Sequence, residues 1–133
     1  LSFPGSVQAA SYFHTIDVMV MTSLSEGQPL VILEGFACGV PCVATDVGAC
    51  REIILGNSQD RLGAAGDITE AINPVQTATA MMRLVADAAH YERTAQIARL
   101  RAQTYYDEEL FLSAYRQVYS HMLSIAEERI WQA

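Results

Sequence analysis

The sequence predicts an α/β fold with a parallel sheet and a helical C-terminal segment. Two short apolar runs, at 18–21 and 42–44, have the length of buried strands. Each is followed by a loop and then by residues at helical spacing, the order of elements that builds parallel strands. From residue 74 onward the pattern is helical only, with no internal repeat and no low-complexity linker.

The first expected elements precede the strand at 18–21 in the sequence. Residues 1–5 are expected to end a strand and turn, because a proline and a glycine interrupt regular structure there. A short helix is expected to end near residue 14, with either Ser6 or Ser11 at its start. Together these elements predict one β-α-β unit with a right-handed crossover.

The next helix is expected from Pro29 to about Cys38, since proline suits the first turn of a helix. Its apolar residues at helical spacing are Leu30, Leu33, Phe36 and Ala37. Gly39 suits the residue just after a helix, and Pro41 prevents its continuation. A strand at 42–44, a loop at 45–48 and a short helix at 49–55 are expected to follow.

The second half of the chain predicts one weak strand and three helices. Residues 57–61 are turn-rich, and 62–67 are expected to form a thin strand followed by a loop. Helices are expected at 74–87, at 90–103 and from 107 or 108 to about 129. The last of them has an apolar stripe that predicts packing on one face, formed by Leu110, Phe111, Ala114, Tyr115, Val118, Tyr119, Met122, Leu123 and Ile125.

Composition excludes several classes of function. The net charge of the 133 residues is −7 and every basic residue is an arginine, so no basic surface for nucleic acid is expected. No apolar run approaches the roughly 20 residues that span a bilayer, and no signal peptide is recognisable at the start. A cytoplasmic chain is the expectation, and the start without methionine suggests a piece of a longer protein.

The cysteines and histidines are expected to be structural. Cys38, Cys42 and Cys50 are an odd set, and apolar residues surround the first two, which favours buried thiols in a reducing compartment over a metal site. No acid or cysteine stands at catalytic spacing from any histidine, and the three are His14, His90 and His121.

Two glutamates bracket the junction of loop and helix after the first strand. Glu26 lies in the loop and Glu34 in the helix, with seven residues between them. Gly27 allows backbone to approach a ligand closely, and the free amides of a helix start favour hydroxyls, phosphates or carboxylates. Ligands of open α/β sheets sit outside the carboxyl ends of the strands, so this junction is the candidate binding site.

These residues resemble the donor-binding half of the GT-B glycosyltransferases of family 4. The resemblance rests on the two glutamates with their flanking serine, glycine and proline at 25–34, and on the run GVPCVATDVG at 39–48. Within the family, the segments 25–34 and 45–52 are most similar to the branch that polymerises the bacterial Pel exopolysaccharide. The detailed match covers residues 1–56, and a looser one continues to about Tyr119.

The resemblance implies that the chain is part of a retaining enzyme that uses neither metal nor cofactor. Glu26 would be the catalytic residue that holds donor-sugar hydroxyls, and Glu34 would accept hydrogen bonds from the ribose. The residues implied to bind the donor are Glu26, Gly27, Gln28, Leu30, Val31 and Glu34. The donor would be a nucleotide diphosphate sugar, with uridine favoured, and the acceptor a growing exopolysaccharide held by another, N-terminal domain.

The resemblance also implies the organisation of the chain. Residues 1–106 would be the C-terminal part of a Rossmann-like donor domain, and 107–133 a helix that packs back on the N-terminal domain. The aromatic residues near this end are expected to form core or domain contacts, and they are Tyr105, Tyr106, Phe111, Tyr115, Tyr119 and Trp131. The segment alone is expected to be inactive.

Other interpretations of these residues stay open. The chain could be a non-catalytic α/β module for assembly or regulation, since a fold does not determine a function. Thr45 and Asp46 could bind a ligand, although turn formation and capping explain them more simply. Arg51 and Glu52 are expected to pair with each other on the surface.

Overall fold

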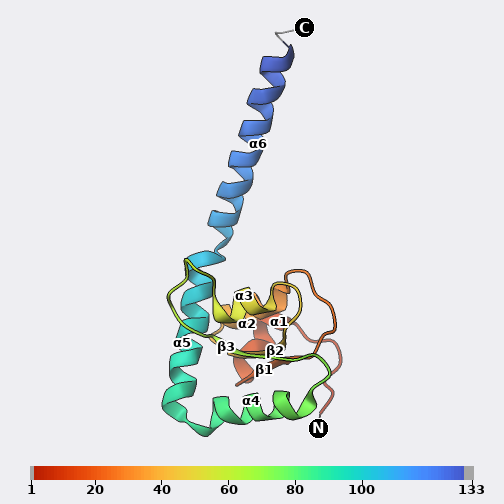
Figure 1. Ribbon diagram of the computed structural model, residues 1–133, viewed down its shortest axis with the longest axis vertical. Coiled ribbons are helices and arrows are strands. Elements are labelled where there is room, and N and C mark those ends of the chain that lie inside the picture. Colours follow the sequence, from red (N-terminus) through yellow and green to blue (C-terminus); the bar gives the residue numbers. More distant parts are fainter. Residues whose placement is uncertain (1, 131–133) are drawn as a thin grey trace.

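The computed structural model describes residues 2–130, and for residues 10 and 125–130 it describes the backbone alone. A three-stranded parallel sheet lies at the centre of the fold (Figure 1). Its strands are β1 (Met19–Met21), β2 (Cys42–Thr45) and β3 (Gly66–Thr69), in the spatial order β1-β2-β3. The α/β fold with a parallel sheet is therefore confirmed.

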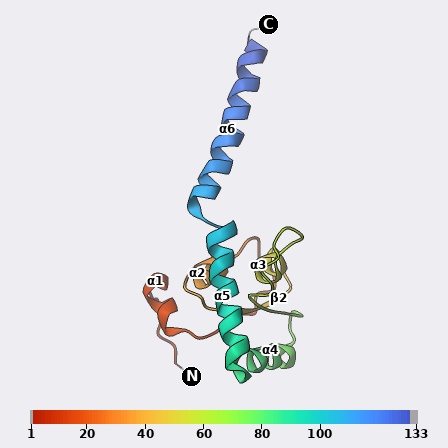
Figure 2. The ribbon, with the colours of Figure 1, turned by 90° about the vertical axis from the view of Figure 1, so that its left-hand side faces the viewer.

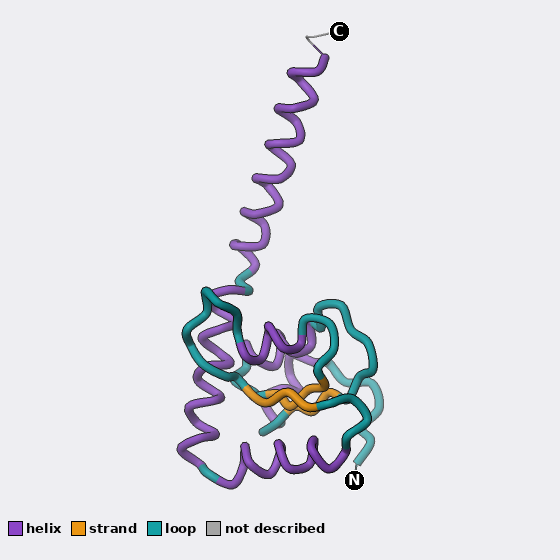
Figure 3. The backbone as a smooth tube through the Cα atoms, viewed as in Figure 1, coloured by secondary structure: helices purple, strands orange, loops and turns teal. Residues whose placement is uncertain are grey.

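Helices cover both faces of this sheet (Figures 1 and 3). The two crossover helices, α2 (Leu30–Ala37) and α3 (Cys50–Leu55), lie on one face, and α4 (Pro74–Ala86) lies on the other. Crossovers of the same hand between successive parallel strands put both connecting helices on the same side. The helix α5 (Ala88–Tyr105) runs past one end of the layers and packs against both α2 and α4, as Figure 2 shows.

The core follows from the alternation of side chains along β2, all four of whose residues are buried. Cys42 and Ala44 face α2 and α3, where they pack with Ile32, Phe36 and other buried residues. Val43 points to the opposite face and packs with residues of α4. The central strand is thus apolar on both sides, as parallel strands with helices on both faces must be.

The ends of the helices follow the expected local chemistry. The chain leaves α2 through Gly39 at φ 79°, with the Val40 amide bonded to the Gly35 carbonyl, which is the Schellman geometry. Asn73 accepts from the Gln76 amide at the start of α4, where Pro74 occupies the first helical position.

Two of the expected strands are absent or shifted in the structure. No strand forms in the described residues before β1, and Phe3 is 89% exposed there. The strand expected at 62–67 begins only at Gly66, because the β-branched Ile68 and Thr69 continue the pairing with β2. Gly66 is required at this point, since a β-carbon on it would lie 1.8 Å from the Cys42 carbonyl oxygen.

The first helix begins between the two expected starting residues. It consists of α1 (Ala9–Tyr12) and the 3₁₀ turn η1 (Phe13–Thr15), with Gln8 before it and no side-chain cap. Neither candidate serine therefore starts it. The buried Phe13 ring anchors this segment against Gly35 of α2.

The inward face of α2 also differs from the expected one. Ile32, Gly35 and Phe36 are the buried residues of α2, whereas Leu30 and Ala37 are exposed. In α4 the inward positions are taken by small residues and Leu84, while Met82 is 65% exposed. An apolar residue at helical spacing does not by itself identify the buried stripe when the whole helix is apolar.

The last helix, α6 (Glu108–Ile130), projects away from the rest of the fold (Figure 1). Phe111, Tyr115 and Tyr119 are 58%, 52% and 63% exposed, so they do not belong to the core of this chain. The expected contact with another domain stays a prediction, as does the division at residue 106. Trp131 lies outside the described residues. None of the helices that the structure describes is long and apolar enough to cross a membrane.

Candidate functional site

The candidate site lies where β1 and β2 end and their connecting loops turn back. The loop after β1, residues 22–29, contains Glu26, Gly27 and Gln28, of which the first is half-buried and the other two are exposed. Pro29 closes the loop as a buried residue with ψ 102°, so the helix begins at Leu30, one residue later than expected. The carboxyl ends of parallel strands are where α/β proteins bind their ligands.

The first turn of α2 keeps backbone donors free. Among the described residues, the amides of Leu30 and Val31 have no backbone acceptor, and no side chain caps this helix. The side chains of Leu30, Val31 and Glu34 lie three and four residues apart, and all are exposed. The start of α2 therefore offers free amides, and an exposed carboxylate follows about one turn further along the helix.

Neither glutamate is used in holding the fold together. Among the side chains that the structure describes, neither the Glu26 nor the Glu34 carboxylate forms an ion pair or accepts a hydrogen bond. The two come from one loop-helix unit, yet the hollow of about 360 Å³ at this end of the sheet includes neither of them. It is lined by Thr22, Leu24, Thr45, Ile72, Asn73, Pro74, Thr77, Ala78 and Met81.

The loop after β2 holds the loop that carries Glu26. The Thr45 hydroxyl donates to the Ser23 carbonyl at 2.5 Å, and the Ala49 amide donates to the Gly27 carbonyl at 2.9 Å. Gly48, between them, lies against the Glu26 carbonyl. The sequence indicated Thr45 as a turn residue, but it gave no sign that these residues contact the preceding loop.

The charged residues that follow β2, in its loop and in α3, pair differently from the expectation. Arg51 forms an ion pair with Asp46 at 2.5 Å, and Glu52 instead accepts from the Asn57 side-chain amide at 3.1 Å. The expected Arg51–Glu52 pair was wrong, because adjacent residues on a helix point in different directions. The hydrogen bond from Arg51 lowers the pKa of Asp46 below its ordinary value of 3.8. Asp46 is thus engaged in shaping the loop.

The cysteines are free thiols, and Cys42 and Cys50 are buried. Burial, with a smaller contribution from Cys50, raises the pKa of Cys42 to about 12. Burial also raises the pKa of Cys50, and the negative charge of nearby Glu26 adds to it. In the described part of the chain no group of three metal-ligating side chains comes together.

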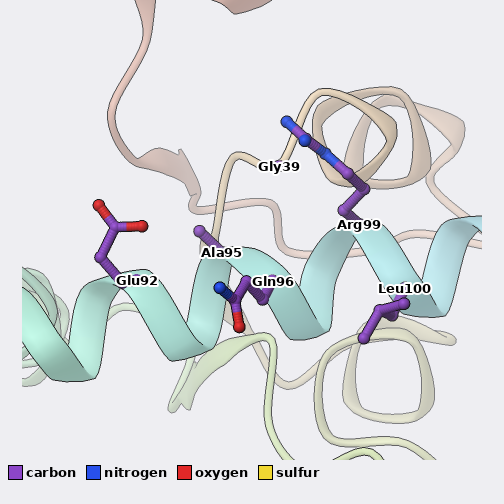
Figure 4. A pocket seen from close by; sticks show the side chains of 6 residues that line it. All are labelled: Gly39, Glu92, Ala95, Gln96, Arg99 and Leu100. Carbon is purple, nitrogen blue, oxygen red and sulfur yellow. The ribbon is translucent and has the colours of Figure 1, made fainter.

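A second hollow, of about 460 Å³, lies at the opposite end of the sheet (Figure 4). It is formed by one face of α5 and by Gly39, which precedes β2 instead of following it. Arg99 crosses it and donates to the Cys38 carbonyl at 3.1 Å, which satisfies the carboxyl end of α2. This hollow is separate from the loops that carry the two glutamates.

The curated proteins similar to this chain include several that are named glycosyltransferases. A D-inositol 3-phosphate glycosyltransferase from Paenarthrobacter aurescens is 33% identical over 119 residues, which are 87% of this chain and 28% of the relative. An N-acetyl-alpha-D-glucosaminyl L-malate synthase from Bacillus anthracis is 31% identical over 107 residues, 80% of this chain and 26% of the relative. The chain therefore spans roughly a quarter of the length of these relatives.

Solved structures with the same fold include sucrose-phosphate synthase from Thermosynechococcus elongatus, with a TM-score of 0.76 at 24% identity. The similarity covers 86% of this chain and 27% of that one. The C-terminal domain of a group 1 glycosyl transferase from Francisella tularensis has a TM-score of 0.65 at 27% identity, over 80% of this chain and 52% of that one. The model of the family "Glycosyl transferases group 1" matches residues 1–87. The fold of this chain matches part of these GT-B structures, and the chain belongs to the group 1 family of glycosyl transferases.

Proposed function

We propose that this chain is the donor-binding portion of a retaining glycosyltransferase of family 4. The whole protein transfers a sugar from a nucleotide diphosphate sugar, with uridine as the base, to a growing glycan of the exopolysaccharide type. The observation that carries the proposal is the pair of unengaged carboxylates, Glu26 and Glu34, beside free backbone amides at the start of α2. Membership of the group 1 family supports it.

The chemistry of each group fits one part of such a donor. A carboxylate accepts hydrogen bonds from two neighbouring hydroxyls, so Glu34 suits a ribose and Glu26 suits a hexose. Free amides at a helix start favour negative charge, so the backbone at Gly27, Gln28, Leu30 and Val31 suits the diphosphate.

In this account Glu26 acts on the transferred sugar itself. Its carboxylate holds the sugar hydroxyls and stabilises the positive charge that develops at the reacting carbon. The diphosphate leaves from the same face on which the acceptor enters, so the configuration of the sugar is retained. No metal or cofactor takes part in the proposed reaction.

The other parts of the reaction belong to other parts of the protein. The acceptor is held by a separate N-terminal domain, against which we expect the exposed aromatic face of α6 to pack. The buried free thiols Cys42 and Cys50 fit a reducing compartment, which supports the proposal of a cytoplasmic reaction. The chain by itself is expected to be inactive.

Donor turnover by the full-length protein tests this proposal. Release of nucleoside diphosphate from a panel of nucleotide sugars is followed by mass spectrometry, and the configuration of the product by NMR. Uridine diphosphate sugars are expected to react with retention, and Glu26→Gln is expected to abolish the reaction. Glu92→Gln, which removes an exposed carboxylate of α5, is the matched control. Turnover by Glu26→Gln at the parent rate would contradict the proposed role of Glu26.

A further inference from the structure

The hydroxyl of Thr45 connects two segments that are far apart in the sequence. Thr45 is the last residue of β2 and is only 2% exposed. Its hydroxyl donates to the carbonyl of Ser23, in the loop after β1, at 2.5 Å. Because this proton is used inside the protein, the hydroxyl does not need a ligand to be satisfied.

Gly48 and Ala49 hold the other end of the same loop. The Ala49 amide donates to the Gly27 carbonyl at 2.9 Å. Gly48 has φ 52°, and a β-carbon there would lie 2.2 Å from the Glu26 carbonyl oxygen. Only glycine permits both this backbone conformation and this close approach.

These contacts enclose Glu26 from both sides. Ser23 stands three residues before Glu26, and Gly27 follows it directly. The Asp46–Arg51 ion pair also connects the start of the loop after β2 to α3. The backbone around Glu26 is therefore fixed by β2 and its loop, while the Glu26 carboxylate stays unengaged.

We propose that Thr45 and Gly48 are positioning residues, which fix the loop 22–29 so that Glu26 meets the donor sugar in the productive geometry. This inference rests on the proposed function, since it assigns these residues a role in donor binding through Glu26. A displacement of about 1 Å from the productive geometry can lower catalysis by roughly 100-fold. Loss of the Thr45 hydroxyl is therefore expected to lower kcat/KM for the donor by about 10- to 100-fold.

The test compares three variants of the full-length protein. Thr45→Val keeps the shape of the side chain and removes the hydroxyl, whereas Thr45→Ser keeps the hydroxyl and restores the bond. Thr69→Val is the matched control, because Thr69 pairs with Thr45 in the sheet register, ends β3 and is also 2% exposed. The Thr69 hydroxyl bonds Ala44 and Thr77 and does not reach the loop 22–29.

Two readouts are measured on each variant: kcat and KM for the donor, and hydrogen exchange of the peptide covering 45–50, which contains the bonded Ala49 amide. Thr45→Val is expected to lower kcat/KM and to speed exchange in this peptide at least about fivefold, since the Ala49–Gly27 bond opens with the loop. Thr45→Ser is expected to match the parent. Thr69→Val is expected to alter thermal stability alone.

Unchanged exchange and unchanged donor kinetics in folded Thr45→Val would overturn the inference. Faster exchange without any change in kcat/KM would also overturn it, because the loop would move without consequence for the donor. If Glu26→Gln leaves turnover intact, the proposed function fails separately, whatever the Thr45 variants do. Should Thr45→Val not fold, Gly48→Ala displaces the same loop through the Glu26 carbonyl and is expected to give the same pair of changes.

Discussion

Replacing Arg101 by methionine is expected to lower the free energy of unfolding by about 3–5 kcal/mol. The Arg101 side chain is fully buried, and its guanidinium donates to the Asp60 carboxylate at 2.5 Å, to the Ile54 carbonyl at 2.6 Å and to the Gly63 carbonyl. Methionine leaves the Asp60 carboxylate, which is only 6% exposed, without its countercharge. The loss is large because a stranded buried charge cannot recover its hydration.

Urea unfolding followed by far-ultraviolet circular dichroism measures this loss. Arg116→Met is the control, because it removes an ion pair at the surface. The Arg116 Nη1 and Glu109 Oε2 atoms are 4.0 Å apart, and the two side chains are 70% and 80% exposed. An exposed pair of this kind contributes about 0.5 kcal/mol or less. If the free energy of unfolding of Arg101→Met lies within about 1 kcal/mol of that of the parent chain, Arg101 does not anchor α5 to α3 and to the loop after it, and the reasoning is refuted.

The same variant has a predicted dependence on pH. Burial by itself raises the pKa of Asp60. Hydrogen bonds from Arg101 and from the Leu62 amide, together with the charge of Arg101, lower it by more than burial raises it, so the pKa lies below its ordinary value of 3.8. At pH values above the ordinary pKa of an aspartate, the Asp60 carboxylate therefore stabilises the folded parent protein. This contribution is lost as the pH falls through the lowered pKa of Asp60. Without Arg101, burial raises the pKa instead, so the deficit of the variant should shrink between about pH 7 and about pH 3. A deficit independent of pH would contradict this explanation.

Three further outcomes are expected. Phe36→Ala, at a fully buried position of α2, should cost about 3–5 kcal/mol in urea unfolding, whereas Val75→Ala, 75% exposed, should cost less than about 0.5; equal losses would contradict the core assignment. Asn73→Ala removes the cap of α4 and should cost about 1 kcal/mol, and a loss near zero would show that the cap is dispensable. Cys42, with its pKa of about 12, is ionised in roughly one molecule in 10,000 at about pH 8, so iodoacetamide should modify the half-buried Cys38 first in mass spectra of the folded chain.

The order of elements could be predicted from the sequence because its signals are local. Gly39 and Pro41 end α2 and lead into β2 by their own backbone preferences, and Asn73 with Pro74 starts α4 in the same way. The strand β3 could not be placed so well, because alanine and glycine carry little strand preference. Its start is set by pairing with β2, which requires a glycine opposite Cys42.

The site could be predicted only in part. The spacing of Glu26 and Glu34 was a weak signal by itself, and it pointed to a site only together with the flanking motifs that carry the family resemblance. Among the described side chains, neither carboxylate has a hydrogen-bond or ion-pair partner. The contacts of Thr45 and Gly48 with the earlier loop could not be predicted, since they join residues 20 or more positions apart through backbone carbonyls. A carbonyl has no sequence signature, so such contacts become visible only in three dimensions.

The most direct test of the donor site is a calorimetric titration of a uridine diphosphate sugar into the full-length protein, alongside Glu26→Gln, Glu34→Gln and the control Glu92→Gln. A hydrogen bond to a charged group contributes about 1.5–3 kcal/mol, so each of the first two variants should raise Kd by roughly 10- to 100-fold. Glu92→Gln should bind as the parent does. Saturable binding with an unchanged Kd in both site variants, or no binding of any nucleotide sugar to the folded protein, would contradict the donor site at Glu26 and Glu34.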